Sequence, residues 1–218
     1  IVHHRYSTSL DETIFEKKSD DEIILCLNYD GLYGINNINR FLQNNNSNRA
    51  YKIGVWVYKV GDPILFNETE RFAPVLYNNL KGKIVQIEPT DNGMFFSIEI
   101  NTAITEWDAD DVGLDLLDPI HPGKSVVRFF VSNKTNTDED GQDIETIVPF
   151  QVSYAVSIHK AQGLEYDSVK VVITEEVDEM ISHNIFYTAI TRTKNMLKIY
   201  WSPESQEKII SRFEKKDI

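Results

Sequence analysis

The first quarter of the chain has the hydrophobic pattern of an α/β protein. Residues 22–27 form a short, mostly apolar run, which predicts a strand covered on both faces. After a polar break at 28–31, apolar residues recur at helical spacing from 32 to 43, and 44–48 is a polar loop. A strand, a turn and a helix in this order predict the start of an α/β unit.

The middle of the chain has a different pattern. Gly, Pro, Asn and Asp separate short β-type segments, and this spacing favours a small antiparallel barrel or sandwich. An exposed hairpin tip or loose loop is expected at 132–143. The predicted strands are 55–60, 64–66, 83–87, 95–100 and 126–131.

From residue 149 the α/β pattern returns. Ser182 or Asn184 can cap one of the predicted helices. We therefore expect an α/β domain made of residues 1–53 and 150–218, interrupted by a β-rich insertion at 54–149. The predicted elements are strands at 154–158, 169–173 and 196–201, a turn into a short helix at 159–163, and helices at 184–193 and 206–215.

Charge is concentrated in the insertion. The 218 residues have a formal net charge of −12, which argues against phosphate binding by the whole surface. Residues 54–149 carry 17 acids and 7 bases, whereas the two flanks are nearly balanced. The acidic middle is either functional, as a surface that mimics nucleic acid or as a site for a hard cation in the run 106–118, or a solvated face. The solvated face is preferred because the run lacks calcium-loop spacing.

Contact between this acidic insertion and a nucleic acid would have to be local. Lys81 and Lys83 are candidate phosphate contacts. Trp56, Phe66 and Phe72 are candidates for stacking on a base, although a place in the core is the preferred interpretation for each ring.

The cysteine content and hydropathy restrict the class of protein. Cys26 is the single cysteine, so no internal disulfide can form, and a cytoplasmic location is expected. No run approaches the roughly 18 apolar residues of a membrane span, and no membrane partner is expected. The chain begins with Ile1, so we expect either a processed protein or a piece of a longer one.

Two polar clusters carry candidate chemistry. Residues 157–167, Ser-Ile-His-Lys-Ala-Gln-Gly-Leu-Glu-Tyr-Asp, gather polar groups where a buried strand ends, and ligands of open α/β sheets bind at that edge. In 187–192, Tyr-Thr-Ala-Ile-Thr-Arg, Thr188 and Arg192 lie one helical turn apart. An arginine held on a helix can present a fixed fork of donors to a phosphate.

Together and in this order, the two clusters resemble motifs V and VI of superfamily 1 helicases, most closely the RecD-like and UvrD-like C-terminal domain. Residues 25–43 resemble the region around motif IV, and 61–67 with 79–85 resemble the segment that leads into a small Src-homology-3-like barrel. The resemblance implies a P-loop-NTPase-like (RecA-like) second motor domain with that barrel inserted and without a P-loop of its own.

The resemblance also implies roles for individual residues. Arg192 matches the arginine finger that reaches the γ-phosphate of ATP, and Thr191 would pack beside it. The matched ATP-site positions are Gly163, Glu165 and Gln162. Glu165 would lie near the ribose of ATP, and Gln162 would couple the ATP site to the nucleic-acid site. The matched nucleic-acid-binding positions are Ser157, which stands where Thr is more usual, His159 and Lys160.

Half of an ATPase site is missing from the sequence. No Gly-x-x-x-x-Gly-Lys-[Ser/Thr] motif occurs, and Glu175-Glu176 is interpreted as a solvated turn. We therefore expect a fragment of an ATP-dependent DNA helicase that is inactive alone, holds no cofactor or metal by itself, and depends on the parent's N-terminal RecA-like domain for ATP and Mg²⁺.

The family further implies single-stranded DNA as a partner, and DNA repair or recombination as the setting. The alternative is a non-catalytic helicase-like module that binds nucleic acid or protein. If Arg192 were buried in an internal ion pair, the finger assignment would fail.

Overall fold

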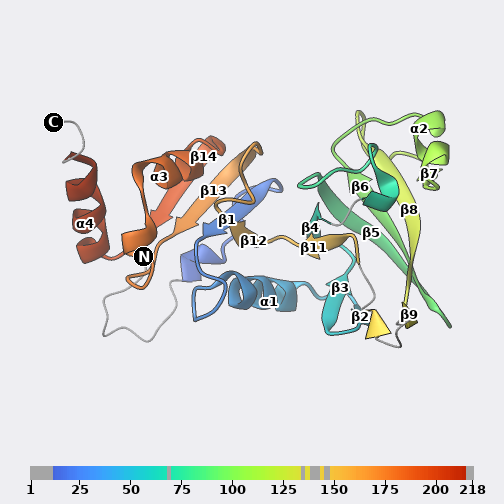
Figure 1. Cartoon of the computed structure of the whole chain (residues 1–218), viewed down its shortest axis with the longest axis horizontal. Helices are drawn as coiled ribbons and strands as arrows, with labels where there is room; N and C mark the ends of the chain where they lie inside the picture. The colour runs from blue at the N-terminus through green and yellow to red at the C-terminus, as the bar shows by residue number, and fades with distance from the viewer. Residues whose placement is uncertain (1–11, 68–69, 134–135, 138–142, 145–147, 215–218) are drawn as a thin grey trace. The chain divides into compact units, whose positions relative to one another are not determined.

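The structure is a computed structural model that describes residues 12–67, 70–133, 136–137, 143–144 and 148–214. The chain folds into two compact units (Figure 1). Unit 1 comprises residues 1–42 and 154–218, and unit 2 comprises residues 43–153. The insertion predicted at 54–149 lies within unit 2.

Unit 1 is built on a four-stranded sheet in the order β12-β1-β13-β14, in which every pair is parallel. The last four residues of β1 are buried, as expected for a strand covered on both faces. The strands are β1 (Glu22–Cys26), β12 (Ala155–Ser157), β13 (Tyr166–Val172) and β14 (Thr193–Tyr200). The helices are η1 (Glu12–Ile14), α1 (Ile35–Asn45), η3 (Asp178–Met180), α3 (His183–Ile190) and α4 (Pro203–Glu214).

The core of unit 1 lies between the sheet and its first helix. Ile24 and Val172 of the sheet pack in one cluster with Ile35 and Ile38, which lie at helical spacing on α1. Cys26 belongs to the same cluster, and its burial raises the pKa of the thiol to about 12. The thiol is therefore protonated at neutral pH and unreactive.

Every described strand pair of unit 2 is antiparallel, as the spacing of its short β-type segments predicted. Its main sheet has the order β11-β4-β5-β6-β8-β7, and β2–β3 and β9–β10 are separate two-stranded sheets. The main sheet consists of β4 (Pro63–Phe66), β5 (Lys81–Thr90), β6 (Gly93–Ile100), β7 (Asp115–Leu117), β8 (Ser125–Ser132) and β11 (Phe150–Val152). The remaining elements are β2 (Ala50–Ile53), β3 (Trp56–Lys59), η2 (Glu70–Phe72), α2 (Glu106–Asp111), β9 (Asn136–Thr137) and β10 (Asp143–Ile144).

The main sheet is an open order of strands with β11 at one edge and β7 at the other. This order does not establish a Src-homology-3-like barrel, which stays a prediction. The loop expected at 132–143 contains β9 and lies partly outside the described residues.

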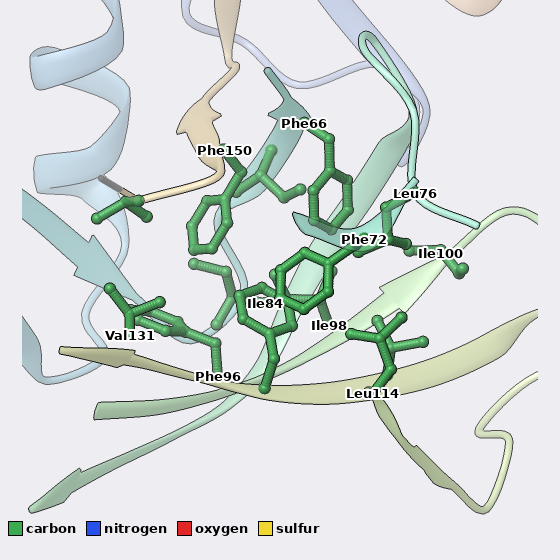
Figure 2. Close-up of a cluster of buried hydrophobic side chains, with 14 of the residues drawn as sticks. Phe66, Phe72, Leu76, Ile84, Phe96, Ile98, Ile100, Leu114, Val131 and Phe150 are labelled. Carbon is green, nitrogen blue, oxygen red and sulfur yellow. The ribbon is translucent and has the colours of Figure 1, made fainter. Parts of the chain in front are cut away.

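Phenylalanine rings pack together with Ile, Leu and Val side chains in the core of unit 2 (Figure 2). Phe66 and Phe72 are fully buried, so both belong to the core, as preferred from the sequence. Phe150 lies edge to face with Phe66 and with Phe96, at ring-centroid distances of 6.0 and 5.1 Å. Trp56 is 62% exposed, and the core interpretation of this side chain is wrong.

Two local expectations differ from the structure. Residues 159–163 form turns without the predicted short helix. The acidic run instead contains a helix, α2, which begins with a capping box between Thr105 and Asp108. Six residues are too few to show an apolar period, so the sequence pattern missed it.

Two searches of the described residues complete the fold. No group of three or more His, Cys, Asp and Glu side chains among them is placed to hold a metal ion. The helices of the described part of the chain are too short or too polar to cross a membrane.

Candidate functional site

The first polar cluster lies on the connection between β12 and β13. Because β12, β1 and β13 are parallel, residues 158–165 carry the chain from the carboxyl end of β12 to the amino end of β13. The expectation that the whole cluster lies at the carboxyl edge is therefore correct only for its first residues. Gly163 and Glu165 lie toward the opposite edge, where β14 also begins.

Ser157 and Lys160 are joined at the start of this connection. Ser157 is buried, and its hydroxyl accepts a hydrogen bond from the Lys160 backbone N–H at 3.2 Å. The Ser157 carbonyl accepts another from the Ala161 N–H. Ser157 therefore shapes the turn, while His159 is exposed and Lys160 is half-buried. Threonine is more usual at this position of the motif, and the serine supplies the same hydroxyl as acceptor for the Lys160 N–H.

Gly163 and Glu165 form the far end of the connection. Gly163 has φ +84°, a conformation that side chains rarely adopt, and no atom lies within 4 Å of the position of a Cβ. The backbone, rather than crowding, therefore requires glycine. Glu165 and Gln162 are both exposed. The Glu165 carboxylate lies 3.6 Å from the Lys194 ammonium.

Arg192 ties the second cluster to the first. Its Nη1 donates a hydrogen bond to the Leu164 carbonyl at 3.0 Å, and its own carbonyl accepts from the Tyr166 N–H at 2.8 Å. The guanidinium therefore lies beside the Leu164–Glu165 peptide, which follows Gly163. The structure brings these three candidate ATP-site residues together.

The Arg192 guanidinium keeps part of its donor capacity. Nε donates to the Thr188 carbonyl at 3.0 Å and Nη2 donates to the Thr191 hydroxyl at 3.1 Å. With the bond to Leu164, three of the five N–H donors of a guanidinium are engaged. No carboxylate among the described residues forms an ion pair with Arg192, so the condition that would exclude a finger is not met.

Helix α3 positions this arginine. Its N-cap is Ser182, whose hydroxyl accepts a hydrogen bond from the Ile185 N–H, as one of the two predicted caps. The helix ends at Ile190, earlier than predicted, and Thr191 is its C-cap. The Thr191 hydroxyl donates to the Tyr187 and Thr188 carbonyls, so the helix end itself holds the acceptor for Nη2.

Sequence reasoning missed the backbone groups of this site. The carbonyl of Leu164 and the N–H of Tyr166 make the contacts that join the two clusters. Every residue has these groups, so no residue type in the sequence signals them.

Known proteins carry the same pattern. Residues 152–200, which contain both clusters, match the UvrD-like helicase C-terminal domain family. The resemblance to superfamily 1 helicase C-terminal domains is confirmed. RecBCD enzyme subunit RecD from Buchnera aphidicola is 24% identical to this chain over 204 residues. The matched part is 88% of this chain and 28% of that protein. The ATP-dependent RecD2 DNA helicase of Deinococcus radiodurans is 35% identical over 66 residues, which are 28% of the chain and 9% of that helicase.

A solved structure supports the fold. Bacteroides Pif1, bound to single-stranded DNA, is similar over 92% of this chain and 47% of its own, with 17% identity and a TM-score of 0.50. The likeness shows the α/β fold of a helicase RecA-like domain, as predicted. The chain thus spans less than half of each of these three proteins.

Proposed function

We propose that this chain is the C-terminal motor-domain part of an ATP-dependent superfamily 1 DNA helicase. In this proposal Arg192 is the arginine finger, and Ser157, His159 and Lys160 form part of the surface for single-stranded DNA. The observation that carries the proposal is the hydrogen bond from the Arg192 guanidinium to the Leu164 carbonyl. It joins the two helicase-like clusters into one site.

The chemistry follows from the donors of Arg192. Two N–H donors have no partner among the described residues, and a guanidinium is always charged. Phosphoryl transfer builds negative charge on the γ-phosphate oxygens, and a fixed cation there lowers the barrier. Gly163 and Glu165 would contact the nucleotide, and Gln162 would couple nucleotide binding to DNA.

The other half of the ATP site would come from an N-terminal RecA-like domain. That domain would hold ATP and Mg²⁺ through a P-loop and an acidic pair. The Gly123-Lys124-Ser125 tripeptide here is no substitute, because strand β8 follows it and Lys124 pairs with the buried Glu99. We therefore expect no ATP hydrolysis by this chain alone. Turnover by the purified chain that depends on Arg192 would contradict this.

The deciding experiment is ATPase activity of the full-length parent with Arg192→Ala. We expect turnover stimulated by single-stranded DNA to fall by roughly 10³-fold or more, because the transition-state charge loses its cation. ATP binding, measured with a fluorescent analogue, should be largely retained. Arg192→Lys keeps the charge but loses the fork, and should recover only part of the rate.

Arg71→Ala is the matched control, since Arg71 is exposed on η2, outside the segments that resemble helicase motifs, and should leave turnover unchanged. Undiminished stimulated turnover in Arg192→Ala would contradict the finger assignment and favour a non-catalytic helicase-like module.

A further inference from the structure

Strands β2 and β3 form a two-stranded hairpin (Figure 1). Its tip presents apolar side chains to solvent. Gly54, at φ +56°, and Val55 connect the two strands. Val55 is 77% exposed and Trp56 is 62% exposed. Exposed apolar side chains do not contribute the stabilising free energy of burial, so their exposure calls for an explanation.

The exposed tip does not result from a loosely packed hairpin. Ile53 pairs with Trp56 and Tyr51 pairs with Tyr58, so the four side chains share one face. On that face Ile53 and Tyr58 are buried. The Tyr58 ring lies edge to face with Phe96 and Phe150 at 5.5 and 5.3 Å. The face is anchored in the core of unit 2, and only its tip extends into solvent.

A polar network holds the base of the hairpin. Asp62 is fully buried, and its carboxylate accepts hydrogen bonds from the Gln43 amide, the Asn46 amide and the Lys59 N–H at 2.6, 2.9 and 2.8 Å. The Lys59 ammonium donates in turn to the carbonyls of Gln43 and Asn46. Gln43 also donates to the Val57 carbonyl. The tip is thus presented from a base with fixed geometry.

The hairpin differs in charge from the rest of unit 2. Residues 43–61 contain three bases and no acid, whereas 62–149 contain 17 acids and 6 bases. Arg49 is exposed, and its guanidinium lies 5.2 Å from the centroid of the Tyr51 ring. Lys52 is exposed on the other face, without a partner among the described residues. A hairpin with a tryptophan at its tip, Lys52 near the tip and Arg49 just before its first strand is complementary to a strand of stacked bases and phosphates.

We propose that the tip of the β2–β3 hairpin binds single-stranded DNA. Trp56 stacks on an unpaired base, and Arg49 and Lys52 contribute attraction for the phosphates. This contact rests on the proposed helicase function, and it is distinct from the surface formed by Ser157, His159 and Lys160.

The test is binding of a fluorescein-labelled oligothymidylate to the purified chain, measured by fluorescence anisotropy. Trp56→Ala should weaken binding by roughly 5- to 150-fold, the range for loss of one stacked base. Trp56→Phe should restore most of the affinity. Arg49→Ala should lower the slope of log affinity against log salt by about one.

Trp107→Ala is the matched control, because Trp107 is 87% exposed in the same unit but lies on the acidic helix α2. It should bind like the wild type. Equal affinity of Trp56→Ala and wild type would overturn the hairpin contact, as would equal losses in both tryptophan variants.

A Lys160→Ala variant separates this inference from the function on which it rests. If Lys160→Ala weakens binding and Trp56→Ala does not, the helicase surface stands and the hairpin contact fails. If the wild-type chain does not bind oligothymidylate, the proposed DNA surface and the hairpin contact fail together.

Discussion

Glu99 is a buried carboxylate that contacts two side chains, His121 and Lys124. It lies on β6 with 4% of its side chain exposed, hydrogen bonded to His121 and to the Lys124 ammonium. Lys83 stands opposite it on β5. Burial raises the pKa of the Glu99 carboxyl, but the bonds from His121 and Lys124 outweigh burial and hold this pKa below its ordinary value of 4.5.

This arrangement predicts acid sensitivity of unit 2. A carboxyl whose folded pKa is depressed contributes stability above its unfolded pKa, and the contribution is lost as pH falls through the folded value. We expect the free energy of unfolding to decrease as the pH is lowered from about 4.5. The Glu99→Gln variant should show a smaller decrease over the same pH range. Urea unfolding at a series of pH values measures it. Asp110→Asn, at an exposed position, should keep the wild-type pH dependence, and an unchanged dependence in Glu99→Gln would contradict the assignment.

At the scale of elements, Asp62 joins three segments. Its carboxylate holds the end of α1 through Gln43 and Asn46 and the end of β3 through Lys59. Its backbone carbonyl accepts from the Ile84 N–H on β5. One buried residue therefore links the end of β3 with Gln43, Asn46 and β5.

Asp62→Ala should leave these donors without their acceptor. A buried unsatisfied donor costs roughly 1–3 kcal/mol, so we expect a loss of about 3 kcal/mol in the free energy of unfolding by urea. Because the base of the hairpin loosens, protection of the β2 and β3 amides from hydrogen exchange should fall most. A loss under about 0.5 kcal/mol, as expected for the exposed Asp110→Ala, would show that the network is dispensable.

At the scale of the whole molecule, each unit has a core of its own. Among the residues that the structure describes, the cluster around Ile24, Ile38 and Tyr200 in unit 1 shares no member with the cluster around Phe96 and Phe150 in unit 2. Two cores on one chain favour two cooperative transitions instead of one.

Phe96→Ala tests this separation. Phe96 is fully buried, so its truncation should cost about 3–5 kcal/mol in the unfolding of unit 2. Hydrogen exchange of β1 and β13 in unit 1 should stay unchanged. An equal loss of protection in both units would mean that they unfold as one.

The sequence alone determined the class of most segments, because hydrophobic spacing reports which residues face a core. It missed the short helix α2 and wrongly predicted a helix within 159–163. The buried run at β1, the helical spacing of Ile35 and Ile38, and the antiparallel pattern of unit 2 were all readable in this way. The two polar clusters were readable because their residue types and spacing match a known pattern, and residues 152–200 match the same family.

Only the tertiary structure decided how these parts meet. The hydrogen bond from Arg192 to the Leu164 carbonyl depends on the path of the connection between β12 and β13. Every residue has a backbone carbonyl, so the sequence does not indicate which one accepts this bond. Trp56 and Phe66 are both aromatic residues of short β-type segments, yet one is 62% exposed and the other fully buried. That difference follows from hairpin register and strand order, which are set by contacts between distant residues.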